Sequence, residues 1–240
     1  MAYRFAVIRS SNDTDGRLYP LLGHDGESVQ PEDWDVDHIQ LVSKNLVVKD
    51  WIDKKPTQVL RLKDVPTSVI VTRSRLIVSC EQWNKGRRMW GLGLGATVAA
   101  ATNLERRVRE SRQRDGRLLL GHLRYHWIKE VGYYPRQNVV SPAQLRLSVS
   151  HKVDAGTDPH TLTVDLFLPL ATNPLQLSQT IVRRAAKYRL EHFTVSDEQK
   201  EAFETLVSNP AFPEPTGAQF SMCRMPSSYF VNASTAYPER

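Results

Sequence analysis

The chain has 240 residues, of which 40% are hydrophobic and 24% are charged. This composition is ordinary for a globular protein and excludes a wholly disordered chain. The formal net charge is +6, and the whole excess lies between Lys85 and Arg117, because the rest of the sequence sums to zero. The chain has two cysteines and no apolar signal core after Met1, so we expect a cytoplasmic protein, free or peripheral at the membrane.

The first half of the chain is predicted to form several short strands. Residues 3–9 have a strand-like pattern, and residues 10–37 are rich in Asp, Gly, Ser and Pro, which is typical of a long loop. Apolar and β-branched runs then predict strands at residues 38–51, 58–62, 67–71, 75–80 and 118–128. The run from Thr67 to Cys80 has a polar turn at its centre and therefore predicts a hairpin.

The second half predicts two alternating strands and then two helices. Apolar residues alternate with polar ones in 145–149 and 162–168, as in half-buried antiparallel strands. Asn173 followed by Pro174 and Gln176 predicts the start of an amphipathic helix, and Ser196 with Gln199 predicts a second, shorter one. After these helices the chain is rich in Pro and Ser and is predicted to be an extended tail.

Six or seven strands followed by a long helix predict a mainly β, α+β fold. Two architectures fit: a small β-barrel, or two packed antiparallel sheets, in either case capped by the amphipathic helix. We expect an N-terminal strand and loop over residues 1–37, a domain over 38–193 that contains a basic helical insertion at 85–116, and a short helix with a tail over 194–240. The strict strand–helix alternation of a doubly wound sheet is absent.

Two segments resemble the bacterial PH-like domains of the GRAM-like kind. Thr67–Glu81 (TSVIVTRSRLIVSCE) looks like the hairpin of that group, and His126–Gly132 (HWIKEVG) looks like the strand that follows it. The resemblance covers residues 38–192, and the insertion and the tail depart from it. It implies a PH-like fold that binds lipid headgroups, peptides or proteins without catalytic machinery. It transfers no functional residue to this chain.

The insertion is the candidate contact surface. Its Ala-rich centre should be helical through Arg114, with Glu105–Arg109 and Glu110–Arg114 as favourable i,i+4 pairs. Basic and aromatic side chains of this type suit an anionic partner, such as a phospholipid surface or an acidic protein. The candidate binding residues are Arg87, Arg88, Trp90, Arg106, Arg107, Arg109, Arg112 and Arg114.

Other interpretations of the insertion stay open. The helix could expose its arginines to water without a partner, or it could self-associate through a stripe of small residues, as a homo-oligomeric scaffold protein would. Nucleic acid is a weaker alternative, because Trp90 is the one aromatic residue near the arginines. The uncharged run 89–104 is too short to cross a hydrocarbon core of about 30 Å, so no transmembrane segment is predicted.

The sequence shows no motif of a metal- or nucleotide-dependent enzyme, so we predict neither a cofactor nor a metal. His122 and His126 would be about 13 Å apart on a strand, which is too far for one zinc ion. Cys223 lies next to Arg224, which could lower the pKa of the thiol. A non-catalytic binding module is therefore expected, and an enzyme with an unrecognised site is a further alternative.

Overall fold

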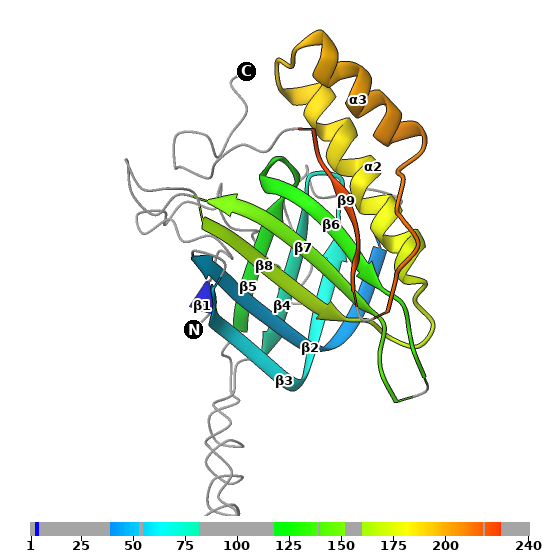
Figure 1. The fold of residues 1–240 in the computed structure, drawn as a ribbon. Helices are drawn as coiled ribbons and strands as arrows, with labels where there is room; N and C mark the ends of the chain where they lie inside the picture. The colour runs from blue at the N-terminus through cyan, green and yellow to red at the C-terminus, as the bar shows by residue number, and fades with distance from the viewer. Residues whose placement is uncertain are drawn as a thin grey trace, which may run out of the picture.

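The computed structural model describes residues 3–4, 39–52, 55–81, 118–138, 140–151, 160–217 and 219–226. Within these ranges the chain is mainly β-structure with helices near its C-terminal end (Figure 1). The strands are β1 (Tyr3–Arg4), β2 (Ile39–Ile52), β3 (Lys55–Val71), β4 (Arg75–Glu81), β5 (Leu118–Arg124), β6 (Ile128–Tyr134), β7 (Gln144–His151), β8 (His160–Phe167) and β9 (Ser221–Arg224). The helices are the 3-10 turn η2 (Tyr125–Trp127) and the α-helices α2 (Pro174–His192) and α3 (Asp197–Ser208).

The described strands pair in the order β1-β5-β4-β3-β2-β8-β7-β6-β9. Every pair is antiparallel except the short parallel pair of β1 and β5. The order ends at β1 on one side and β9 on the other, so the described strands do not close into a barrel. The barrel prediction was therefore wrong, and the described strands form two antiparallel sheets that share β2 and β3. Strands β1, β5 and β4 extend the first sheet, and β8, β7, β6 and β9 extend the second.

The long strands β2 and β3 join the two sheets. The first half of β2 pairs with the end of β3, which in turn pairs with β4, whereas Leu46–Trp51 of β2 pair with β8. The pairing of β2 with β3 shifts register between Ser43 and Asn45 and again between Val48 and Lys49, and such bulges bend a strand. The buried Ser43 hydroxyl holds the first bend, because its single proton is shared between the carbonyl oxygens of Asn45 (2.7 Å) and Phe167 (2.9 Å) and its oxygen accepts from the Phe167 amide (3.1 Å).

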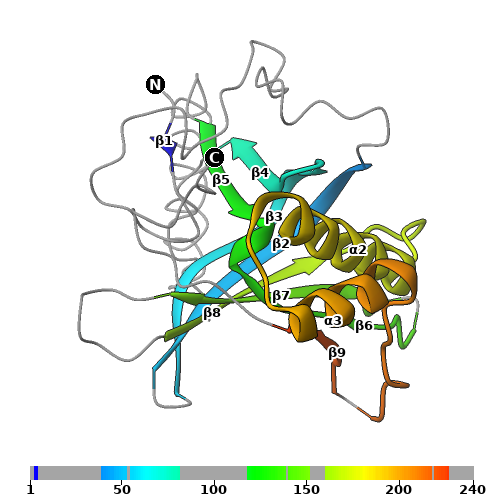
Figure 2. The ribbon, with the colours of Figure 1, turned by 90° about the horizontal axis from the view of Figure 1, so that it is seen from above.

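The predicted amphipathic helix is confirmed as α2. The Asn173 side chain accepts a hydrogen bond from the Gln176 amide, and Pro174 occupies the first turn. The buried face of α2 packs on β6, β7 and η2, and α3 lies beside α2, as Figure 2 shows from above. That buried face consists of Leu177, Ser178, Ile181, Val182, Ala185, Ala186, Tyr188 and Arg189. The capping box of Ser196 and Gln199 at the start of α3 is also confirmed.

The prediction of one strand over residues 118–128 was wrong. The chain turns at η2, and this turn separates β5 from β6. The turn is fixed by distant partners: the Tyr125 amide donates to the Ser74 carbonyl at 3.3 Å, and an Arg189 guanidinium donates to the His126 carbonyl. Because these contacts are tertiary, local β-propensity could not predict the break.

The predicted tail after residue 209 contains a strand. Residues of β9 pair with β6 from Glu130↔Arg224 to Tyr133↔Ser221, which makes β9 an edge strand of the second sheet. The pairing brings the backbone of Gly132 close to Met222: a Cβ atom at Gly132 would lie 2.1 Å from the Met222 sulfur. The extended-tail prediction was therefore incomplete, and a short, partly polar strand of this kind has no periodic signal of its own.

Candidate functional site

The predicted binding residues of the insertion all lie outside the described residues. The structure does describe the two strands from which the insertion leaves and to which it returns. Strands β4 and β5 pair from Arg75↔Arg124 to Glu81↔Leu118. Partners in an antiparallel ladder have Cα atoms about 4.5–5.5 Å apart. The two ends of the basic segment therefore attach to the ends of two paired, neighbouring strands.

The opposite end of β4 is a tightly bonded turn. The Thr72 hydroxyl donates to the Arg75 carbonyl at 2.8 Å and accepts from the amides of Ser74 (3.2 Å) and Arg75 (3.1 Å). The Thr72 amide donates to the same Arg75 carbonyl at 2.9 Å. A Thr at this position satisfies the backbone groups of a turn that would otherwise need water.

Side chains from other elements attach this turn to the helix. Arg184 of α2 donates to the carbonyls of Val71 (2.8 Å) and Thr72 (3.0 Å), and the Tyr125 hydroxyl donates to the Thr72 carbonyl at 2.5 Å. The Tyr125 ring also meets the Tyr188 ring edge-on, with centroids 6.3 Å apart. Strand β4, after which the insertion begins, is thus anchored at its other end to α2.

Three arginines lie in the interior of the described structure: Arg75, Arg124 and Arg189. Arg189 reaches the His126 carbonyl, and its guanidinium carbon lies 5.8 Å from the Phe193 ring centroid and 5.9 Å from that of Phe203. Such contacts hold a buried cation in place. Because these guanidinium groups are buried, they belong to the core and do not form a surface for an anionic partner.

His126 is a core residue as well. It is buried in η2, stacked on Tyr188 at 6.1 Å and tilted against Phe193 at 5.0 Å. The strand geometry expected for His122 and His126 was wrong, since His126 lies on a 3-10 turn after β5. In the part of the chain that the structure describes, no group of three or more potential metal ligands occurs.

Cys223 is a buried thiol on β9. Burial raises the pKa of the Cys223 thiol above its ordinary value, because a thiolate would lose its solvation there. The neighbouring Arg224 does not lower it: its guanidinium is largely exposed and binds the Glu130 carboxylate at 2.7 Å. The described environment therefore disfavours a reactive thiolate.

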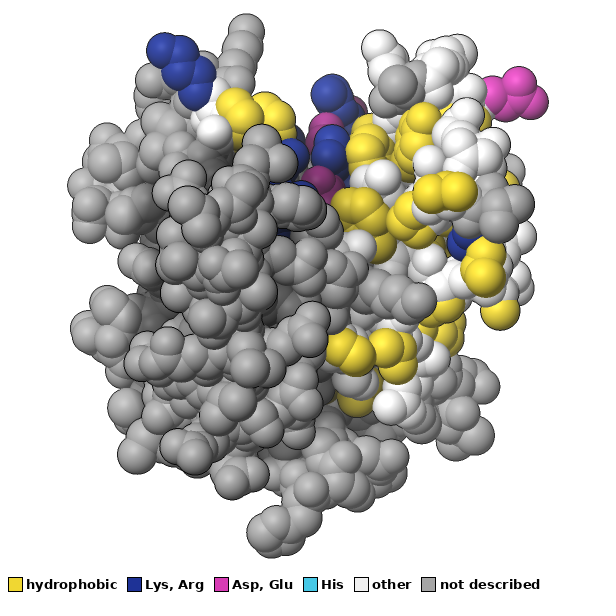
Figure 3. Space-filling view, turned by 90° about the horizontal axis from the view of Figure 1, so that it is seen from below, with side chains coloured by type: hydrophobic (Ala, Val, Ile, Leu, Met, Phe, Trp, Pro, Cys, Tyr) yellow, Lys and Arg dark blue, Asp and Glu magenta, His cyan; other side chains and the backbone are white. Residues whose placement is uncertain are grey.

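A groove that the sequence did not predict lies where β2, the end of β8 and two connecting segments meet. It has a volume of about 390 Å³ and is open to solvent. Its described lining is mostly apolar and comprises Val42, Asn45, Arg136, Val140, Pro142, Phe167, Leu168, Pro169 and Leu170. Figure 3 shows hydrophobic side chains gathered on one face of the described structure.

Three exposed apolar side chains line this groove. Val140 is 89% exposed, Leu170 is 74% exposed and Val42 is 50% exposed. They come from strand β2 and from two connecting segments. Single exposed hydrophobic residues are normal, but a cluster of them around a hollow is typical of a binding surface.

Hydrogen bonds hold the walls of the groove in place. The Asn138 side chain accepts from the amides of Val140 (3.0 Å) and Ser141 (2.7 Å). The Leu168 amide donates to the Ala143 carbonyl at 2.8 Å, which joins the loop after β6 to the end of β8. The groove is thus largely preformed, as ligand sites usually are.

No protein-family model matches this sequence, and no curated protein is similar to it. None of the helices in the described part of the chain is long and apolar enough to cross a membrane.

Proposed function

We propose that this chain is a non-catalytic, PH-like binding module that contacts an anionic surface through its basic insertion. The observation that carries the proposal is the position of the charge. The whole net charge of +6 belongs to residues 85–117, and both ends of that segment attach at the pair Glu81↔Leu118. An excess of positive charge on a single inserted segment favours a partner of negative charge.

An anionic phospholipid membrane is the favoured partner, and an acidic protein is the other. Each basic residue close to an anionic membrane adds about 1 kcal/mol of attraction. Trp90 within the same segment suits the interfacial region, where amphipathic rings gather. This contact places the protein at the periphery of the membrane.

The fold supports a binding role of the PH-like kind. Two antiparallel sheets are followed by an amphipathic helix that packs on β6 and β7, and strand β4, which begins after the polar turn at Thr72, leads into the insertion. Arg184 of α2 fixes the turn at the start of β4, so this strand is a stable support for the segment that follows its other end.

Vesicle sedimentation tests the proposal. Wild type should sediment with vesicles that contain phosphatidylserine, and it should stay in solution with phosphatidylcholine alone or at high salt. A quadruple variant with alanine in the insertion should bind the anionic vesicles at least tenfold more weakly. Its substituted residues are Arg106, Arg107, Arg109 and Arg112.

A matched variant controls for net charge. It also loses four positive charges, but from exposed positions of the described fold: Arg61, Arg73, Lys187 and Lys200. If the insertion is the contact surface, this control should lose much less vesicle affinity than the insertion variant. Equal losses would show that net charge alone drives binding, and no binding of wild type would overturn the membrane as partner.

Concentration-dependent dimerisation without lipid binding would instead favour the self-associating scaffold.

A further inference from the structure

We propose that the groove between β2, the end of β8 and the loop after β6 binds a small anionic amphiphile. Such a ligand has one apolar tail and one carboxylate or phosphate head. This site is built from described residues and shares no residue with the basic insertion, so either proposal can fail without the other.

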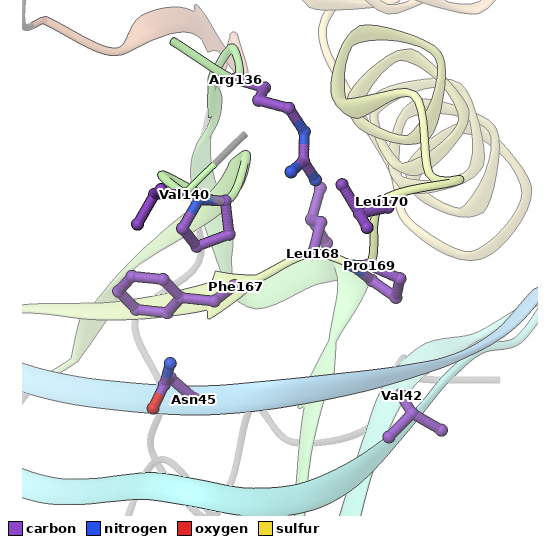
Figure 4. A pocket seen from close by; sticks show the side chains of 9 residues that line it. Val42, Asn45, Arg136, Val140, Phe167, Leu168, Pro169 and Leu170 are labelled. Carbon is purple, nitrogen blue, oxygen red and sulfur yellow. The ribbon is translucent and has the colours of Figure 1, made fainter. Parts of the chain in front are cut away.

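The lining defines the chemistry of the ligand. Among the described residues around the groove, Arg136 alone is charged, and the others are apolar except for Asn45. In Figure 4 the Arg136 side chain extends from the segment after β6 toward Leu168 and Leu170. Its guanidinium is therefore at the edge of an apolar surface, where one anionic group would complement it.

Arg136 is free to accept such a partner within the described structure. No hydrogen bond or ion pair joins it to another described residue, and no acidic residue is among the described lining. A guanidinium binds a carboxylate or phosphate through paired N–H donors, which a neutral head group cannot use as well. Charge complementarity therefore selects an anion.

A hydrocarbon tail fits the remaining lining better than a peptide does. A peptide brings backbone N–H and C=O groups that must be hydrogen-bonded when they are buried. The described side chains of the groove offer one amide, on Asn45, and the guanidinium of Arg136. A tail against Val42, Phe167 and Leu170 has no such requirement, and it covers side chains that are now exposed to water.

The size of the groove favours a single short tail. Its volume of about 390 Å³ is near the lower end of the range of about 300–1,000 Å³ that small-molecule sites occupy. The fixed walls, with Ser43 bonded to Phe167 and Asn138 bonded to Val140, reduce the conformational entropy that a ligand would have to remove.

Isothermal titration calorimetry on the full chain tests the site, without vesicles and with each ligand below the concentration at which it forms micelles or separates from water. Decanoate is the anionic probe, and decanol is the neutral probe with the same tail. Wild type should bind decanoate at one site about tenfold more tightly than decanol, which is the contribution expected of one charge-assisted hydrogen-bonded pair.

Two substitutions test separately how the head and the tail of the ligand contribute to its affinity. Arg136→Gln should remove the preference, so that decanoate and decanol bind equally. Leu170→Asn should weaken both ligands while the tenfold preference remains, and its 74% exposure means that the fold tolerates the change. Arg73→Gln removes an exposed arginine outside the groove and should change neither affinity.

Three results would overturn the proposal. One is that decanoate does not bind wild type more tightly than decanol. Another is a preference that survives in Arg136→Gln, and the third is decanoate binding that Leu170→Asn leaves unchanged. The alanine variant of the insertion should keep full decanoate affinity, so a failure of the membrane proposal cannot be confused with a failure of this one.

Discussion

The contact between Arg184 and the β3–β4 turn should be a major source of stability in this fold. Arg184 of α2 donates to two backbone carbonyls, at 2.8 Å to Val71 and 3.0 Å to Thr72. A hydrogen bond to a charged group contributes about 1.5–3 kcal/mol. Arg184 is only half-buried, so water can replace part of the interaction when it is removed. We therefore expect Arg184→Gln to lower the free energy of unfolding by about 2 kcal/mol.

Chemical denaturation followed by circular dichroism measures this change. The matched control is Arg183→Gln, which removes the adjacent arginine: within the described structure Arg183 has no hydrogen bond or ion pair. This control should change stability by less than about 0.5 kcal/mol. If the two variants lose equal stability, the reasoning from the turn contact is refuted, because helix propensity or net charge would then explain both losses.

A double-mutant cycle makes the test sharper. The Tyr125 hydroxyl donates to the same Thr72 carbonyl that Arg184 contacts, at 2.5 Å. The two donors share one acceptor, so the losses caused by Arg184→Gln and Tyr125→Phe should not add. We expect a coupling of about 0.5 kcal/mol or more, and strict additivity would mean that the two side chains do not act on one turn.

Three further predictions concern other parts of the fold. Gly132→Ala should lower the free energy of unfolding by less than about 1 kcal/mol in denaturation experiments, because the added Cβ meets the sulfur and methyl group of Met222, a flexible and only partly buried side chain that can move aside; a larger loss would mean that Met222 cannot move. In a Cys80→Ser variant, Cys223 is the remaining thiol, and its burial and raised pKa should slow its reaction with a thiol reagent. At about pH 8 the reaction should be at least tenfold slower in the native than in the unfolded protein, and equal rates would contradict the burial. Asn173→Ala should cost about 1 kcal/mol of unfolding free energy through loss of the α2 cap, whereas Asn173→Ser should restore most of it.

Local signals were sufficient for the helices and the alternating strands. Asn173 with Pro174 marked the start of α2 because a cap is a contact between residues three apart, and Ser196 with Gln199 did the same for α3. The period-2 pattern of β7 and β8 reports one buried face for each strand, which does not depend on the partner. These elements follow from the sequence alone.

The features that the sequence could not predict depend on contacts between residues far apart along the chain. The turn η2 depends on carbonyls of Ser74 and on Arg189, which are about 50 and 60 positions away along the chain. Strand β9 exists through its pairing with β6, and nothing in its four residues specifies that partner. No local pattern could have indicated either feature.

The groove is a similar case, since Val42, Arg136 and Leu170 are far apart in the sequence. One weak signal was present. Val140 lies among Pro and polar residues in a loop, and the chain gives it no strand or helix in which to be buried. An apolar residue at such a position indicates a surface contact, but it names neither the neighbours nor the ligand.

The register of the first sheet places the groove near the root of the insertion. Val42 pairs with Ser68, and Ser68 pairs with Ser79, which is two residues before Glu81 at the end of β4. Two strand spacings of about 4.8 Å and two residues of about 3.3 Å separate Val42 from that root by roughly 12 Å.

A membrane that holds the insertion would therefore be close to a groove with affinity for lipid-like anions. If both sites contact one membrane, binding at the first raises the effective lipid concentration at the second. Leu170→Asn should then weaken vesicle binding of wild type but have little effect in the insertion variant, whereas equal effects in both backgrounds would mean that the two sites act separately.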